Sequence, residues 1–137
     1  MAYQIKRKQR VRETLELCNS EGNVELTVHV DIDLDVMGGR IANAHDVLRM
    51  ANELVAEKPD SEEAQEAFGA AVIALFAVIF GKDNADKIIE YYEGRYTEML
   101  LDVFPFINEA VMPKVKEASA SRKQQLLHAA NAMRSGK

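Results

Sequence analysis

The densest run of possible metal ligands in this sequence lies between residues 29 and 35. One histidine and three aspartates occupy alternate positions there: His29, Asp31, Asp33 and Asp35. Alternate residues of a strand share one face, so these side chains would form a row of ligands suited to a divalent cation. A calcium loop, however, needs glycine at its sixth position and glutamate at its twelfth, and counting from Asp31 gives Val36 and Ala42. We therefore interpret the row as a solvated strand face, and we predict no metal site and no cofactor.

The other side chains that often serve in catalysis are scattered along the chain. His29, His45 and His128 share no spacing typical of a ligand set. Cys18 has no sequence neighbour that would activate its thiolate, so we interpret it as a small apolar residue at a strand end. Because each ingredient of an active site has a structural explanation, the sequence predicts a protein that is not an enzyme.

Charge is distributed unevenly over the 137 residues, whose net charge is −5. Residues 1–12 carry +5, residues 113–137 carry +5 and the middle carries −15, which together give −5. An acidic body with basic ends favours head-to-tail self-association or an acidic partner. The basic residues near the N-terminus could contact nucleic-acid phosphates, but the acidic middle would repel a polyanion, so we disfavour nucleic-acid binding.

The composition is that of one globular domain. The contents of 47% apolar and 28% charged residues argue against disorder. A single cysteine and the absence of an apolar signal core after the basic N-terminus favour the cytoplasm. We expect a basic, flexible arm at residues 1–10, a single α+β domain at residues 11–119, and a basic tail or weak helix at residues 120–137.

The N-terminal third shows the alternation of a β-hairpin. Apolar residues occupy the even positions of residues 24–34, with polar residues between them. Upstream, Val11, Leu15 and Leu17 share one parity, and the polar residues 19–23 separate the two runs. Because an isolated hairpin is marginally stable in water, its apolar face should pack on helices or on the sheet of a second copy.

The remainder of the chain predicts helices. Gly38–Gly39 should end the strand, and residues 40–57 then have helical spacing of apolar side chains. Asp60 and Glu63 predict a capping box for the next helix, because a capping carboxylate accepts from amides of the first turn. Further along, Pro105 should break or kink the helix that begins near residue 96.

Residues 67–80 form a long run without a charged side chain. A bilayer span needs about 20 such residues, whereas a run of about 10–14 is more typical of a soluble core, so we predict no membrane partner. The run predicts a central helix, and the fold class is α+β, with an N-terminal β-hairpin or small antiparallel sheet followed by a mostly helical bundle around this helix. One short chain would leave part of it uncovered, which favours self-association.

Aromatic residues cluster around the last helices. Tyr91 and Tyr92 are adjacent and cannot both face inward on one helix, so at least one should be exposed, as tyrosine often is at protein interfaces. The sequence therefore predicts a protein-binding surface from seven aromatic residues: Phe76, Phe80, Tyr91, Tyr92, Tyr96, Phe104 and Phe106.

The segment Ala74–Ile89, ALFAVIFGKDNADKII, resembles the tail assembly chaperones of long-tailed (siphovirus-type) bacteriophages and prophages. In that family an apolar helix ends in a Phe-Gly turn, here Phe80–Gly81. A short helix similar to the stretch from Ala85 to Ile89 follows the turn. A small acidic chain with an N-terminal β element and a helical remainder is also similar to the family.

The resemblance implies a non-enzymatic protein of the host bacterial cytoplasm. It would bind the long, helical tape measure protein and keep it soluble until the tail tube assembles, with the tail tube protein as a further candidate partner. Self-association is also implied. Two alternatives stay open: a nucleic-acid-binding regulator that uses the basic N-terminal arm, and a structural virion or adaptor protein.

Overall fold

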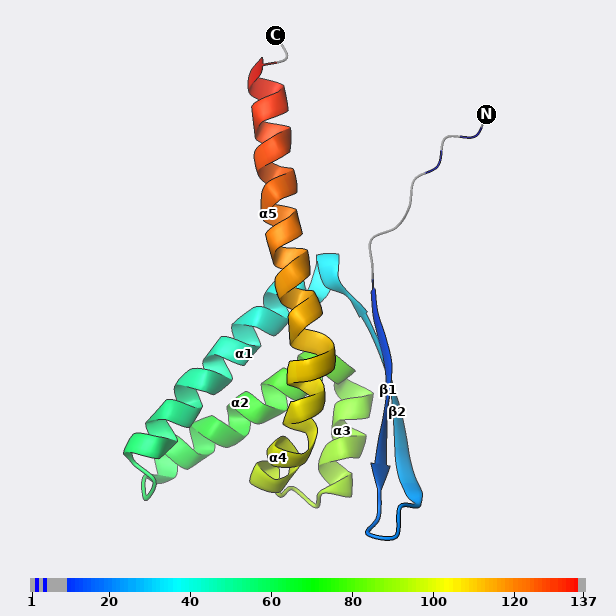
Figure 1. Ribbon diagram of the computed structural model, residues 1–137. Coiled ribbons are helices and arrows are strands. Elements are labelled where there is room, and N and C mark those ends of the chain that lie inside the picture. The colour runs from blue at the N-terminus through cyan, green and yellow to red at the C-terminus, as the bar shows by residue number, and fades with distance from the viewer. Residues whose placement is uncertain (1, 3, 5–9, 136–137) are drawn as a thin grey trace.

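The computed structural model shows an α+β fold, in which a two-stranded antiparallel sheet precedes a group of packed helices (Figure 1). It describes residues 2, 4 and 10–135, so Lys6, Arg7 and Lys8 of the predicted arm lie outside the described residues. Arg10, which we assigned to the arm, is the first residue of a strand. The elements are β1 (Arg10–Cys18), β2 (Val24–Asp33), α1 (Leu34–Glu57), α2 (Glu62–Phe80), α3 (Lys82–Tyr91), α4 (Tyr96–Phe106), a π-helical segment (Ile107–Val111) and α5 (Met112–Ser135).

The predicted β-hairpin is confirmed. Strands β1 and β2 pair from Arg10 opposite Asp33 to Leu17 opposite Leu26, with an irregularity at Cys18. The turn is organised by the Asn19 side chain, whose Oδ1 accepts from two backbone N–H groups within the turn, each at 3.0 Å. Alternation then turns one face of the hairpin toward the helices and buries its aliphatic side chains: Val11, Leu17, Val28, Val30 and Ile32.

Helix α1 begins at Leu34, earlier than the predicted start at residue 40. Asp33 caps it, because the Asp33 Oδ1 accepts from the Asp35 N–H at 3.1 Å. The helix then continues through Gly38–Gly39, so the prediction that these glycines end the strand was wrong. A glycine costs only about 0.5–1 kcal/mol in a helix interior relative to alanine, which the cap and the packing of α1 override.

Helix α2 is capped by Ser61 rather than by the predicted Asp60. The Ser61 Oγ accepts from the Ala64 N–H at 3.2 Å, which satisfies one of the amides left free at the helix start. The pattern around Asp60 and Glu63 therefore located the helix start correctly to within a residue, but it assigned the cap to the wrong side chain.

Replacing the cap should have a measurable cost. We expect Ser61→Ala to lower the free energy of unfolding by about 1 kcal/mol, because the Ala64 N–H loses its acceptor. Asp60→Ala leaves that hydrogen bond in place and should change the value by less than about 0.5 kcal/mol. Urea denaturation followed by circular dichroism measures both, and a larger loss for Asp60→Ala would contradict the assignment.

Helix α2 is the central helix of the bundle, as predicted. It packs against α1, α3, α4 and β2, and Val72, Leu75 and Phe76 are completely buried. By length and composition alone, α2 is apolar enough to cross a membrane, and 39% of the apolar window is buried inside the chain. The uncovered side carries small and aliphatic residues: Ala67, Ala70, Ile73 and Ala74.

Pro105 changes the helix type and does not end the helix. Helix α4 continues directly into the π-helical segment, which continues into α5. Proline cannot donate a backbone hydrogen bond to the preceding turn, and the widened π-helical turn follows it at once. For the C-terminal residues, where a loose tail and a weak helix were both open, the structure shows helix through Ser135.

Candidate functional site

The row of possible metal ligands is divided between a strand and a helix. His29 and Asp31 lie on β2, Asp33 is the cap of α1, and Asp35 lies within that helix. Arg10 donates from Nε to the Asp31 Oδ1 at 2.7 Å, and its guanidinium also lies 3.5 Å from the Asp33 carboxylate. The hydrogen bond from Arg10 lowers the pKa of the Asp31 carboxyl below its ordinary value. Within residues 10–135, no group of three or more His, Cys, Asp or Glu is placed to hold a metal ion.

The basic residues next to the arm are engaged by the sheet itself. Arg10 pairs with Asp31 and Asp33, and the Arg12 Nε lies 3.7 Å from the Asp31 carboxylate. These ion pairs neutralise part of the positive charge that the nucleic-acid hypothesis requires. The hypothesis then depends on residues outside those that the structure describes.

The histidines and the cysteine lie apart in the fold. The His29 Nδ1 is 3.3 Å from the Thr14 Oγ1 across the hairpin, and the His45 ring stacks on Phe104 with centroids 5.9 Å apart. Cys18 is at a strand end, as expected, but its side chain is exposed. His128 lies on the exposed part of α5.

Two of the seven aromatic residues predicted to bind a partner belong to the core. Phe76 is 0% exposed and Phe80 is 5% exposed, and their rings contact each other with centroids 5.4 Å apart. A partner cannot contact them in this fold, so we correct their assignment to the binding surface. They were grouped with surface residues because a helix that is apolar on all sides gives no sign of which side faces inward.

Tyr91 and Tyr92 are both half-buried and hold helix α3 in place. The Tyr91 hydroxyl donates to the Glu25 Oε1 of β2 at 2.8 Å, and the Tyr92 hydroxyl donates to the Asp102 Oδ2 of α4 at 3.0 Å. Burial, with the Asp102 carboxylate close by, raises the pKa of the Tyr92 hydroxyl above its ordinary value. Their hydroxyl groups therefore connect elements of the same chain.

The last three predicted residues are also partly covered. Tyr96 lies over Gly69 of α2, where an added Cβ would be 3.5 Å from the Tyr96 ring. Phe106 stacks on Phe80 with centroids 6.2 Å apart. Phe104 lines an open groove between α1 and α4.

This α1–α4 groove is a concave surface lined mainly by apolar atoms. Its volume is about 490 Å³. Leu48 is buried beneath it, whereas Leu101 on its α4 side is 70% exposed. The lining residues come from two helices that lie far apart in the sequence: His45, Leu48, Arg49 and Asn52 from α1, and Leu100, Leu101, Phe104 and Pro105 from α4. An apolar groove with a few polar groups at its edge is the usual form of a binding site.

Charged side chains that pair with one another border the α1–α4 groove on its α1 side. The Arg49 guanidinium lies 3.1 Å from the Glu53 carboxylate and 3.9 Å from the Asp46 carboxylate, so it is held within α1. The edge is thereby polar and carries a net charge of −1 from Arg49, Asp46 and Glu53, while the interior is aliphatic and aromatic. This arrangement suits the apolar face of an amphipathic helix, which places anchors at positions i, i+3 or i+4, and i+7.

A second, shallower groove of about 760 Å³ lies between α2 and α4. Gly69, Ala70 and Ile73 of α2 form its floor, and Glu62, Gln65 and Glu66 of the same helix lie at one end. Tyr96 lines the α4 side. Tyr96 and Leu101 also border a common hollow on α4, so the two grooves flank that helix. Apolar surface is therefore available on both sides of α4.

Sequence reasoning identified Phe104 but missed Leu48, Leu100 and Leu101. One local signal was present, because residues 99–101 are consecutive and apolar and cannot all face inward on one helix. Met99 is completely buried, and Leu101 is the residue that points outward. Pairing that residue with α1, however, requires the tertiary structure.

Comparison of the chain with family models, curated proteins and solved structures gave no match. The segment that resembles tail assembly chaperones forms the end of α2, the Gly81 turn and α3.

Proposed function

We propose that this chain is a tail assembly chaperone of a long-tailed bacteriophage or prophage, acting in the host bacterial cytoplasm. In this role it binds the tape measure protein and keeps it soluble until the tail tube assembles, and the tail tube protein is a candidate later partner. The observation that supports the proposal is the open α1–α4 groove, whose Leu101 is 70% exposed. The proposal also draws on the resemblance of residues 74–89 to the family.

The surface chemistry fits a partner that is helical and apolar. A long helical protein that has not yet assembled exposes apolar faces, and these aggregate unless they are covered. The α1–α4 groove offers aliphatic and aromatic contacts to one such face, while the net charge of −5 favours solubility of the complex. An open groove of modest size suits a contact that must later be released.

Substitution of Leu101 tests the proposal. Co-expressed with the tape measure protein of the same tail gene cluster, the natural chain should give a soluble complex. Leu101→Asp should weaken that complex by about tenfold or more, because burying a leucine contributes about 1.5–3 kcal/mol and a buried, unpaired carboxylate adds a penalty. Pull-down and calorimetric titration measure the loss.

Val24→Asp is the matched control, since Val24 is an exposed aliphatic residue at the hairpin end, with 50% exposure. It should bind as the natural chain does. A tape measure protein that stays soluble and unbound in the presence of the chain would overturn the proposed function. Equal affinity of Leu101→Asp and the natural chain would remove the groove as the binding site.

A further inference from the structure

The C-terminal part of α5 extends away from the other elements (Figure 1). We call residues 119–134 the α5 overhang. All of its side chains are exposed, and three are large and apolar: Leu126 at 64%, Leu127 at 63% and Met133 at 83%. An isolated helix of about this length is marginal in water, and most helical stability in proteins comes from packing of an apolar face. The overhang therefore has the form of a helix that packs against another molecule.

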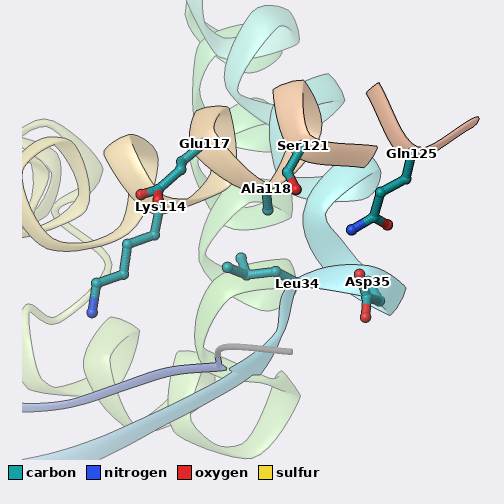
Figure 2. Close-up of a pocket in the computed structure, with 7 residues that line it drawn as sticks. All are labelled: Leu34, Asp35, Lys114, Glu117, Ala118, Ser121 and Gln125. Atoms are coloured by element: carbon teal, nitrogen blue, oxygen red, sulfur yellow. The ribbon is translucent and has the colours of Figure 1, made fainter. Parts of the chain in front are cut away.

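The face of α5 that contacts the body continues along the overhang. Figure 2 shows the point of departure, where Leu34 and Asp35 of α1 lie opposite Ala118 and Gln125 of α5. Near this point Arg122 donates to the Asp35 carbonyl oxygen at 3.4 Å.

Two of the three large apolar residues of the overhang, Leu126 and Met133, lie on this same side of the helix. Val115, 2% exposed, is on the face that packs against the body. At about 100° per residue, Leu126 and Met133 follow Val115 on nearly the same side. Beyond Gln125, which still lines a hollow with Leu34 and Asp35 of α1, this face continues along the helix, and Leu126 and Met133 are exposed on it.

The positive charge of the overhang favours an acidic partner surface. The overhang carries Arg122, Lys123 and Arg134 and no acidic residue, which gives +3 with neutral histidine. Two overhangs packed side by side would place these like charges together, which is unfavourable. An acidic surface with an exposed apolar stripe would be favourable instead.

The body of the same protein provides such a surface on α1. Four apolar side chains of α1 are exposed, at 65%, 46%, 58% and 38% respectively: Val36, Val47, Met50 and Leu54. Their separations of 11, 3 and 4 residues are those of a heptad seam. We call these four residues the α1 stripe. By helical spacing the α1 stripe faces away from the α1–α4 groove, so the two surfaces are separate.

The charge around the α1 stripe is opposite to that of the overhang. Residues 46–66, the far part of α1 and the start of α2, contain seven acidic and two basic residues, which gives −5. Asp46 and Glu53 flank the stripe, at the positions from which coiled-coil helices form charge pairs. The overhang and the stripe also have similar lengths, about 24 Å and about 27 Å at the rise of an α-helix.

We propose that the α5 overhang of one copy packs on the α1 stripe of a second copy of this chain. Leu126, Ala130 and Met133, separated by four and three residues, then meet the seam of Val47, Met50 and Leu54. Arg122 and Arg134 lie beside the acidic flank of that seam. The contact is heterologous, since two different surfaces meet. It involves none of the residues that line the α1–α4 groove.

Sedimentation of the full chain over a range of concentrations tests the contact. The natural chain should form species larger than a monomer, and higher salt should weaken them because the facing surfaces are oppositely charged. The double variant Leu126→Asp, Met133→Asp should weaken association by about tenfold or more, and so should Met50→Asp on the stripe. All three positions are exposed, and circular dichroism checks that both variants remain folded.

Mixing the two variants gives the sharpest result. Each variant retains the surface that the other has lost, so a mixture should form a heterodimer that neither variant forms alone. A monomeric natural chain, an unaffected variant, or a mixture that stays monomeric would each overturn the proposal. Leu101→Asp should associate as the natural chain does, which separates this contact from binding of the tape measure protein.

Discussion

Phe76→Ala should lower the free energy of unfolding by about 3–5 kcal/mol, the largest loss that we expect from any single substitution discussed for this chain. Phe76 is 0% exposed at the centre of α2, and its ring contacts Phe80. The substitution removes apolar contacts on every side and leaves a cavity that the packed helices cannot fully close. Since small domains are stable by about 5–15 kcal/mol, much of the total would be lost.

Urea denaturation at constant temperature measures the effect of Phe76→Ala. Leu101→Ala serves as the control, because Leu101 is 70% exposed. This substitution should change the free energy of unfolding by no more than about 0.5 kcal/mol. If the two substitutions had similar effects, Phe76 would be a surface residue, as the sequence first suggested, and the description of the core would be wrong.

Gly81→Ala should lower the free energy of unfolding by about 1–3 kcal/mol. Gly81 joins α2 to α3 with φ 82° and ψ 158°, a backbone conformation that is essentially restricted to glycine. No atom lies within 4 Å of an added Cβ, so the cost arises from the backbone and not from crowding. Its N–H donates to the Ala77 carbonyl oxygen and its own carbonyl accepts from the Ala85 N–H, so both helix ends depend on this geometry.

Gly39→Ala provides a control of opposite sign. Gly39 lies inside α1 in open space, where alanine should stabilise the helix by about 0.5–1 kcal/mol. Thermal unfolding of the two variants beside the natural chain measures both shifts. A Gly81→Ala protein as stable as the natural chain would show that the turn adopts a different backbone conformation in solution.

Local patterns were sufficient to predict most secondary structure. The alternation of residues 24–34 gave the second strand because one face is buried and the other is solvated. The uncharged run at residues 67–80 gave the central helix, since a helix that is apolar on all sides must be largely enclosed. Both patterns depend only on periodicity, which a single sequence shows directly.

The errors lie where a local signal competes with tertiary packing. The glycine pair Gly38–Gly39 predicts a break in secondary structure. The cap at Asp33 and the burial of Ile41 nevertheless keep both glycines in helix α1. At Pro105 a break or a kink was predicted, and helix α4 instead continues directly into the π-helical segment, so the helix does not end there. Propensity is a weak prior that burial of a neighbouring apolar face overrides.

The candidate site was only partly predictable for a related reason. Its two walls, residues 45–52 and 100–105, are brought together by the packing of α4 against the α1–α2 pair. No periodicity within either segment shows which helices become neighbours. Aromatic content led to Phe104, whereas the exposed Leu101 has no distinguishing chemistry until its surroundings are known.

The most direct test of the proposed function is site-specific photocrosslinking to the tape measure protein. A photoreactive amino acid is placed at position 101 in the α1–α4 groove and, as a control, at position 27 on the exposed face of the hairpin. The proposal predicts a strong crosslink from position 101, located by mass spectrometry in a helical segment of the partner, and little from position 27. Crosslinking from position 27 alone, or from neither position in a soluble complex, would contradict binding at the groove.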